Sequence, residues 1–191
     1  MANYKTYKPE LRKNFNYSCG YCQTREPEIG GSKNSFQIDH YKPKSKFPDL
    51  INNYENLIYA CRACNGYKSD YWPSSIWDNL LKKIILNPRV EDFEKHIDKS
   101  NFAWYGITFR GKWNISTLRL ASETQISIRK DRARIEKLIS KFEKQTLIFQ
   151  TKIHVEQNNG DLGKVKELKT ELKEHMKDIE MLRGKIQGPK D

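Results

Sequence analysis

The sequence predicts an α+β protein with three parts: a small strand-strand-helix unit braced by cysteines, an aromatic-rich middle segment and a C-terminal helical hairpin. Three observations support this prediction. Two Cys-x-x-Cys pairs bracket a stretch with two short apolar runs, all four tryptophans fall in the middle segment, and apolar residues recur every seven positions near the C-terminus. The three parts correspond to residues 1–71, 72–120 and 121–191.

Two short strands are expected in the first part. Residues 35–40 (SFQIDH) alternate polar and apolar side chains, and residues 57–60 (LIYA) form a second apolar run. Residues 41–55 are rich in Pro, Ser and Asn, which favours a loop between the strands. A helix is expected from Cys64 onward, so the order is strand, strand, helix.

The middle segment is expected to pack on this first part. It contains Trp72, Trp77, Trp104 and Trp113, and aromatic residues in such number are usually core residues. Residues 102–113 are expected to form a hairpin that turns at Gly106 or Gly111.

Two amphipathic helices are predicted after Ser122. The first has apolar residues at seven-residue spacing: Ile128, Ile135, Phe142 and Phe149. Gly160 fits the end of this helix and Asp161 fits the cap of a second one. The second helix repeats the spacing with Val165, Leu172, Ile179 and Ile186. A connection this short between two helices predicts an antiparallel hairpin.

Hydrophobicity and net charge indicate where the protein is found and which kind of partner it binds. The 191 residues contain no apolar run long enough to cross a membrane, and we expect a cytoplasmic protein. A formal net charge of +11 favours an acidic polymer as partner, although a basic excess of this size is also a common solubility feature. The cluster Arg129–Arg134 is expected to be a solvated helix face in preference to the alternative, a nucleic-acid groove, because Asp131 interrupts it.

The four cysteines predict a structural zinc site. Cys19 and Cys22 form one Cys-x-x-Cys pair, and Cys61 and Cys64 form the other. In a reducing compartment such pairs indicate a tetrahedral zinc ion rather than disulfides. Four thiolates leave no open position for water, so this zinc would brace the fold without catalysing a reaction.

Residues 15–72 contain a joint pattern made of Cys19, Cys22, Asp39, His40, Asn56, Leu57, Cys61, Cys64, Asn65 and Lys68. With this pattern the segment resembles the HNH endonuclease family, in particular its zinc-braced branch with a ββα-metal core. Many members have a second histidine where this chain has Asn65, so the chain is an H-N-N variant. The resemblance implies nuclease activity, with a structural role for Asn56 in holding the His40 strand across the loop.

Chemistry assigns roles to the other residues of the motif. Phosphodiester hydrolysis needs a base to activate water, and a neutral imidazole such as that of His40 suits this role. Asp39 and the Asn65 amide oxygen offer hard oxygen ligands, which favour Mg²⁺ or Mn²⁺. Lys68, about one helical turn after Asn65, is expected to face a substrate phosphate. Catalytic metal and structural zinc would thus occupy separate sites.

The order of the later segments resembles more loosely the HNH subunits of Septu-type anti-phage defence systems, including retron-associated ones. That resemblance implies an ATPase partner, and we expect residues 121–191 to dock it, although the two helices burying each other is nearly as good an explanation of their pattern. DNA is favoured over RNA as substrate. The alternatives are an HNH nuclease acting on RNA, for example tRNA, and a catalytically silent zinc-dependent nucleic-acid-binding module.

Overall fold

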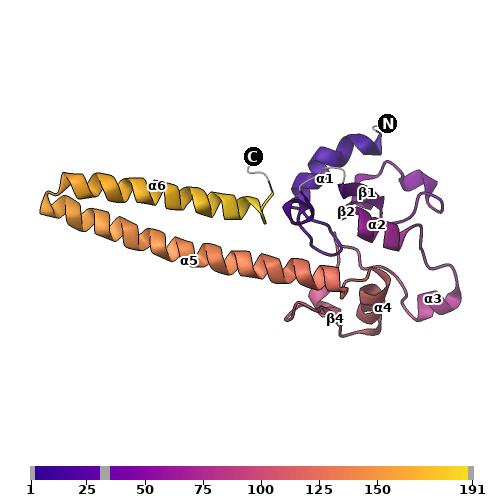
Figure 1. The fold of residues 1–191 in the computed structure, drawn as a ribbon. Helices are drawn as coiled ribbons and strands as arrows, with labels where there is room; N and C mark the ends of the chain where they lie inside the picture. The colour runs from indigo at the N-terminus through magenta and orange to yellow at the C-terminus, as the bar shows by residue number, and fades with distance from the viewer. Residues whose placement is uncertain (1–2, 31–34, 189–191) are drawn as a thin grey trace.

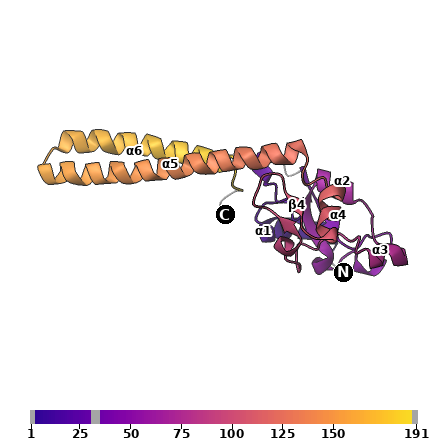
Figure 2. The ribbon, with the colours of Figure 1, turned by 90° about the horizontal axis from the view of Figure 1, so that it is seen from below.

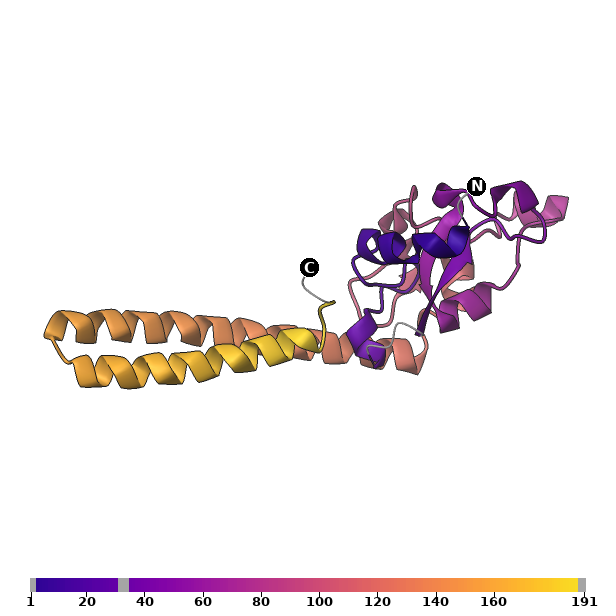
Figure 3. The same cartoon turned by 90° about the horizontal axis from the view of Figure 1, so that it is seen from above.

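The computed structural model describes residues 3–30 and 35–188 of the chain. A globular body carries a long antiparallel pair of helices that projects from it (Figure 1), as the views from below (Figure 2) and from above (Figure 3) also show. The α+β class predicted from the sequence is confirmed. In chain order the elements are α1 (Lys8–Asn14), β1 (Phe36–His40), β2 (Leu57–Cys61), α2 (Arg62–Lys68), α3 (Ile76–Leu80), β3 (Ile97–Asp98), β4 (Tyr105–Gly106), α4 (Phe109–Thr117), α5 (Glu123–Asn159) and α6 (Leu162–Gly184).

Strands β1 and β2 and helix α2 form the predicted strand-strand-helix unit. The strands pair antiparallel, with Phe36 opposite Cys61 and His40 opposite Leu57. Both strands lie within one residue of the predicted ranges. Helix α2 begins two residues earlier than expected, because Cys61 is its N-cap and accepts a hydrogen bond from the Cys64 amide (3.5 Å).

The predicted hairpin over residues 102–113 is wrong. Strand β4 pairs instead with the preceding β3, and the residues after Thr108 form helix α4. Both glycines in this region serve close packing, since a Cβ on Gly106 would lie 2.0 Å from the Lys112 nitrogen and one on Gly111 would lie 1.8 Å from the His96 oxygen. Glycine is therefore required at these two positions because the backbones approach closely there, and not because the chain turns at them.

The aromatic residues of the middle segment are only partly core. Trp104 is buried, and Trp72 and Trp113 pack against the core from partly buried positions. Trp77 contradicts the prediction, because it is 71% exposed on the short helix α3. The neighbouring Ile76 and Leu80 are also exposed, so α3 contributes little to the core.

The helical hairpin has the predicted caps and seam. Ser122 caps α5 by accepting a hydrogen bond from the Gln125 amide, and Gly160 ends the helix in the left-handed conformation (φ 75°). Asp161 then caps α6 through the Lys164 amide (2.9 Å). The seven-residue repeat of α6 faces α5, and its buried members are Val165, Ile179 and Ile186. The prediction of an antiparallel hairpin is confirmed (Figure 1).

Buried apolar residues of the described chain form two clusters. The larger runs from Leu11 to Leu120 and joins residues of the first two predicted parts in one core. The second lies in the hairpin, around Ile139, Ile179 and Leu182. Boundaries at 71/72 and 120/121 remain predictions, and residues 1–2, 31–34 and 189–191 lie outside the described residues.

No helix in the described part of the chain combines the length and the apolar content needed to cross a bilayer.

Candidate active site and metal centre

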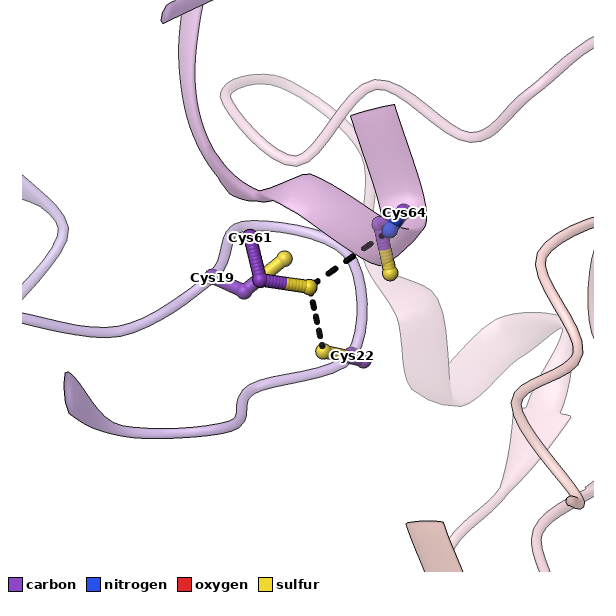
Figure 4. Close-up of side chains that lie close together, drawn as sticks. All are labelled: Cys19, Cys22, Cys61 and Cys64. Atoms are coloured by element: carbon purple, nitrogen blue, oxygen red, sulfur yellow. Dashed lines mark hydrogen bonds between the residues drawn. The ribbon is translucent and has the colours of Figure 1, made fainter. Parts of the chain in front are cut away.

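The four cysteines converge on one buried point (Figure 4). Their sulfur atoms all lie within 4.8 Å of one another, and Cys22 Sγ is 3.7 Å from Cys61 Sγ. A disulfide would need about 2.05 Å between sulfurs. Zn–S bonds of about 2.3 Å in a tetrahedron place the ligand sulfurs about 3.8 Å apart. The donor set therefore fits a tetrahedral zinc ion.

Two backbone turns deliver the cysteines. The first is a tight loop closed by a hydrogen bond from the Cys19 amide to the Thr24 carbonyl (2.9 Å), with Gln23 in the left-handed conformation (φ 60°). It is tied to β2 by a hydrogen bond from the Gly20 amide to the Tyr59 carbonyl (2.8 Å). The second turn is the junction of β2 and α2. Strand pairing and helix capping thus bring the four sulfurs to one point.

The protonation of the cluster also favours a cation. Burial raises the pKa of the Cys19 thiol well above its usual value. Contacts from the sulfurs of Cys19, Cys61 and Cys64 lower the pKa of Cys22. Without a cation, buried neighbouring thiols cannot all ionise, because each new negative charge repels the others. A divalent metal removes this penalty and stabilises the thiolates as a set.

A second site lies beside the cysteine cluster, at the far end of β1. It is a cavity of about 360 Å³. The sequence-predicted residues Asp39, His40 and Asn65 all line it. Its other lining residues are Ile38, Pro43, Lys44, Ser45, Gly66, Ser69 and Asp70. The fold thus brings together three polar residues that are up to 26 positions apart in the chain.

His40 is held in one tautomer. Its Nε2 lies 2.9 Å from the Ile51 carbonyl oxygen. A carbonyl only accepts hydrogen bonds, so Nε2 donates and carries the proton, and Nδ1 keeps its lone pair. The ring is 5% exposed and packs edge-on against Tyr4. Burial lowers the pKa of His40, which keeps the imidazole neutral and able to accept a proton.

Asp39 is held by two buried donors. Tyr21 donates its hydroxyl proton to Oδ2 (2.5 Å), and Lys68 Nζ donates to Oδ1 (3.0 Å). Burial and the neighbouring carboxylate raise the pKa of Tyr21, so the phenol stays a donor. Tyr21 lies between the two cysteines of the first turn, which links the metal centre directly to Asp39. Sequence reasoning missed this residue, whose one signal was its place inside the Cys-x-x-Cys pair.

Lys68 departs from its predicted role. Its side chain is 1% exposed, and its ammonium donates both to Asp39 and to the His40 carbonyl (2.8 Å). An ammonium that is enclosed in this way does not face a phosphate. The prediction is therefore wrong in this structure, because the helix turn that carries Lys68 packs onto β1 instead of facing solvent.

The two asparagines occupy different places. Asn56 closes the loop after β1, since its Oδ1 accepts from the Lys42 amide (2.8 Å) and its Nδ2 donates to the Lys42 and Leu50 carbonyls (3.0 and 3.3 Å). This is the cross-loop contact that the family resemblance implied. Asn65 uses Nδ2 to donate to Gln37 Oε1 (2.7 Å). Its amide nitrogen is thus engaged, which leaves the oxygen as the atom that suits a metal.

The cluster Arg129–Arg134 is not the solvated face that was predicted. Arg129 is 5% exposed, and Arg132 pairs with Glu28 and donates to the Gln23 carbonyl (2.8 Å). Only Lys130 and Arg134 of its basic residues lie in solvent. The start of α5 therefore packs on the first cysteine turn. No local sequence pattern predicts this contact.

The strand pair, the cysteine pairs and α2 together contain the residues that resembled a known nuclease family. Residues 19–70 match the HNH endonuclease family. The resemblance inferred from the sequence is confirmed for this part of the chain. The matched range includes all four cysteines and every predicted residue of the cavity.

Two curated relatives are named Septu protein PtuB. The protein from Bacillus thuringiensis is 30% identical over 105 residues, which cover 55% of this chain and 37% of that protein. The protein from Bacillus mycoides (strain KBAB4) is 27% identical over 123 residues, covering 50% of this chain and 40% of that protein. The chain thus spans about two fifths of the length of these relatives. The resemblance to Septu-type proteins is confirmed, and no solved structure matches significantly.

Proposed function

We propose that this chain is a metal-dependent HNH endonuclease that hydrolyses phosphodiester bonds, of DNA in preference to RNA, as the effector subunit of an anti-phage defence complex. The observation that carries the proposal is the cavity in which His40, Asp39 and Asn65 meet. The family match and the relatives support the reaction class and the biological setting. The net charge of +11 suits a polyanionic substrate.

His40 is the proposed general base. Its Nε2 is committed to the Ile51 carbonyl, so only Nδ1 is available to take a proton from water. The lowered pKa keeps that nitrogen unprotonated at neutral pH. Asn56 supports this arrangement indirectly, because it closes the loop that contains Ile51.

Asp39 and the Asn65 amide oxygen are the proposed ligands of Mg²⁺ or Mn²⁺. Each carboxylate oxygen of Asp39 accepts one hydrogen bond, and each retains a second lone pair. A hard divalent cation bound there supplies positive charge that stabilises the phosphate and the leaving oxygen. Tyr21 and Lys68 hold the carboxylate in place, and Asn65 is oriented by Gln37.

Lys44, and not the buried Lys68, is the proposed contact for a substrate phosphate. Its side chain is exposed and lines the same cavity. It also lies close enough to His40 to lower the pKa of the imidazole through its charge. A flexible ammonium at the mouth of the cavity suits a phosphate oxygen of a bound strand.

The cysteine cluster is proposed to hold one structural zinc ion per chain. Its four buried sulfurs leave no position for water, so the metal braces the first part of the fold. Metal analysis of protein purified without chelators should find one zinc per chain. Cys61→Ser should lose that zinc and unfold residues 1–71, because structural zinc contributes on the order of 10 kcal/mol to folding.

The distal half of the hairpin is the proposed dock for a protein partner, of the ATPase class. The apolar seven-residue repeat of α6 is buried against α5 within the hairpin, so these side chains cannot form the docking face. Other apolar residues stay exposed towards the far end: Leu147, Ile148, Val155 and Leu162. The first three line one shallow cavity on α5, which gives a partner helix a place to pack.

The nuclease proposal is tested by incubating the purified protein with labelled DNA and RNA in Mg²⁺, Mn²⁺ or EDTA. His40→Ala should lower the cleavage rate about 10²- to 10⁴-fold. Ser140→Ala is the control, since Ser140 is exposed on α5 outside both the cavity and the proposed dock, and this variant should cleave like the wild type. Equal cleavage by both variants would assign the base elsewhere, and cleavage of RNA alone would replace DNA as the substrate.

A further inference from the structure

Arg129 is a buried cation with unused hydrogen-bond donors. Its Nη1 donates to the Phe102 and Leu120 carbonyls (both 2.8 Å), and its guanidinium carbon lies 3.6 Å from the centre of the Trp104 ring. Within the described residues, Nε and Nη2 are buried and have no acceptor. Leaving charged donors unpaired in the interior is costly, so an acceptor or a nearby negative charge is expected there.

The helix face that carries Arg129 lies against the first cysteine turn. Gln125 and Arg132 flank Arg129 at four and three positions on the same face of α5. Gln125 contacts Thr24 (3.2 Å), whose hydroxyl is 3.2 Å from Cys22 Sγ, and Arg132 contacts the Gln23 carbonyl. Arg129 therefore lies on the face of α5 that packs on the first cysteine turn.

The charges around Arg129 agree with this placement. Burial lowers the pKa of Arg129 to about 10, which shows how strongly its site disfavours an uncompensated cation. The charges that oppose this effect belong to Cys22 and Cys64. Cys22 and Cys64, one from each pair, are thus the groups whose negative charge as thiolates would stabilise the guanidinium, whereas the charge of Arg132 disfavours it.

We infer that Arg129 is the counter-charge of the cysteine metal centre, and that it ties the base of the helical hairpin to the bound zinc. Four thiolates around one zinc ion leave two negative charges uncompensated, and a buried guanidinium neutralises one of them. The inference rests on the proposed zinc centre. It predicts that zinc affinity depends on a residue of α5 that lies 65 positions beyond the last ligand, Cys64.

A purely structural role for Arg129 makes a different prediction. If the side chain only stacks on Trp104 and donates to two carbonyls, its loss should destabilise the packing of α5 without changing the Zn²⁺ affinity of the folded chain. If it is a counter-charge, a lysine should preserve metal binding better than a glutamine. Arg129→Lys and Arg129→Gln both lose the planar fork, and they differ in charge, so their comparison isolates the electrostatic contribution.

The test measures metal affinity in the full chain with wild type, Arg129→Lys, Arg129→Gln and the control Arg134→Gln. Arg134 is 82% exposed on the same helix, so its loss should leave affinity unchanged. Zn²⁺ affinity is measured by competition with a chromophoric chelator, and Co²⁺ substitution reports the tetrathiolate site by its absorption bands. Arg129→Gln should bind Zn²⁺ about 10-fold more weakly, at the lower end of the loss for groups around a metal centre, because it acts through its charge and not through a contact with a ligand. Arg129→Lys should remain within a few-fold of wild type.

Equal affinity of Arg129→Gln and wild type overturns the inference, as does equal weakening of both Arg129 variants. A wild type that binds neither Zn²⁺ nor Co²⁺ refutes the zinc centre itself, which keeps the two failures distinct. If the variants do not fold, wild-type protein decides by NMR. Replacing Zn²⁺ by paramagnetic Co²⁺ keeps the chain folded and should shift the Arg129 Nε–H resonance strongly, because the ion lies close to the guanidinium; an unchanged resonance refutes the inference.

Discussion

Replacing Lys68 with methionine should destabilise the protein strongly. The side chains of Lys68 and Asp39 are 1% and 5% exposed, and their charged atoms lie 3.0 Å apart. If one of them is removed, water cannot enter to solvate the charge of the other. Their Coulomb attraction is about 5 kcal/mol at an effective dielectric constant of about 20. Removing one partner of such a buried pair typically costs about 3 to 5 kcal/mol, because the other charge stays buried without compensation.

The change is measured by urea unfolding of the zinc-loaded protein and by thermal melting. A loss of about 3 to 5 kcal/mol corresponds to a fall in Tm of about 6 to 20 °C for a chain of this size. Lys130→Met is the matched control, because Lys130 is exposed on α5 and should change stability by less than about 0.5 kcal/mol.

A double variant separates the ion pair from the packing of the side chain. Asp39→Asn with Lys68→Met removes both charges and should recover most of the lost stability, since it leaves no buried charge unpaired. Lys68→Met within about 1 kcal/mol of wild type would show that Lys68 is not enclosed as described, and would return it to the list of candidate phosphate contacts.

Three further predictions follow from other contacts. Tyr21→Phe should keep its zinc but need more Mg²⁺ or Mn²⁺ for cleavage, because Asp39 loses one of its two donors; metal analysis and metal titration of the rate check this. Gly111→Ala should destabilise by about 1 to 3 kcal/mol, since its Cβ would overlap the His96 carbonyl, whereas Gly184→Ala, at an open helical site, should not. Glu26→Gln should lower stability at neutral pH, and its difference from wild type should disappear in acid titrations as pH falls through the lowered pKa of Glu26.

The pH dependence of Glu26 has a definite sign. Burial alone would raise the pKa of Glu26, but hydrogen bonds from Arg12 (2.6 and 2.7 Å) and Tyr59 (2.5 Å) outweigh it and lower the pKa below its usual value of 4.5. The stability contributed by the carboxylate is therefore complete above that usual value and is lost as pH falls through the lowered one. A stability difference between Glu26→Gln and wild type that persisted in acid would contradict this assignment.

The sequence by itself determined the features that depend on local pattern. Alternation predicted β1, the cysteine spacing predicted the cluster of four sulfurs, and Gly160 with Asp161 placed the turn of the hairpin to the residue. Each of these follows from backbone geometry or ligand spacing within a few residues. The sequence also grouped Asp39, His40 and Asn65 through the family motif.

Only the tertiary structure decided which long side chains are buried and what they touch. Lys68 turned out to hold Asp39 from 29 positions away, Tyr21 joined the cysteine turn to the same carboxylate, and Trp77 proved exposed. Arg129 lies in an apparently solvated basic run, yet the packing of α5 on the body buries it. Burial depends on which distant elements meet, and a lysine or arginine has the same local pattern whether its head group faces water or an ion pair.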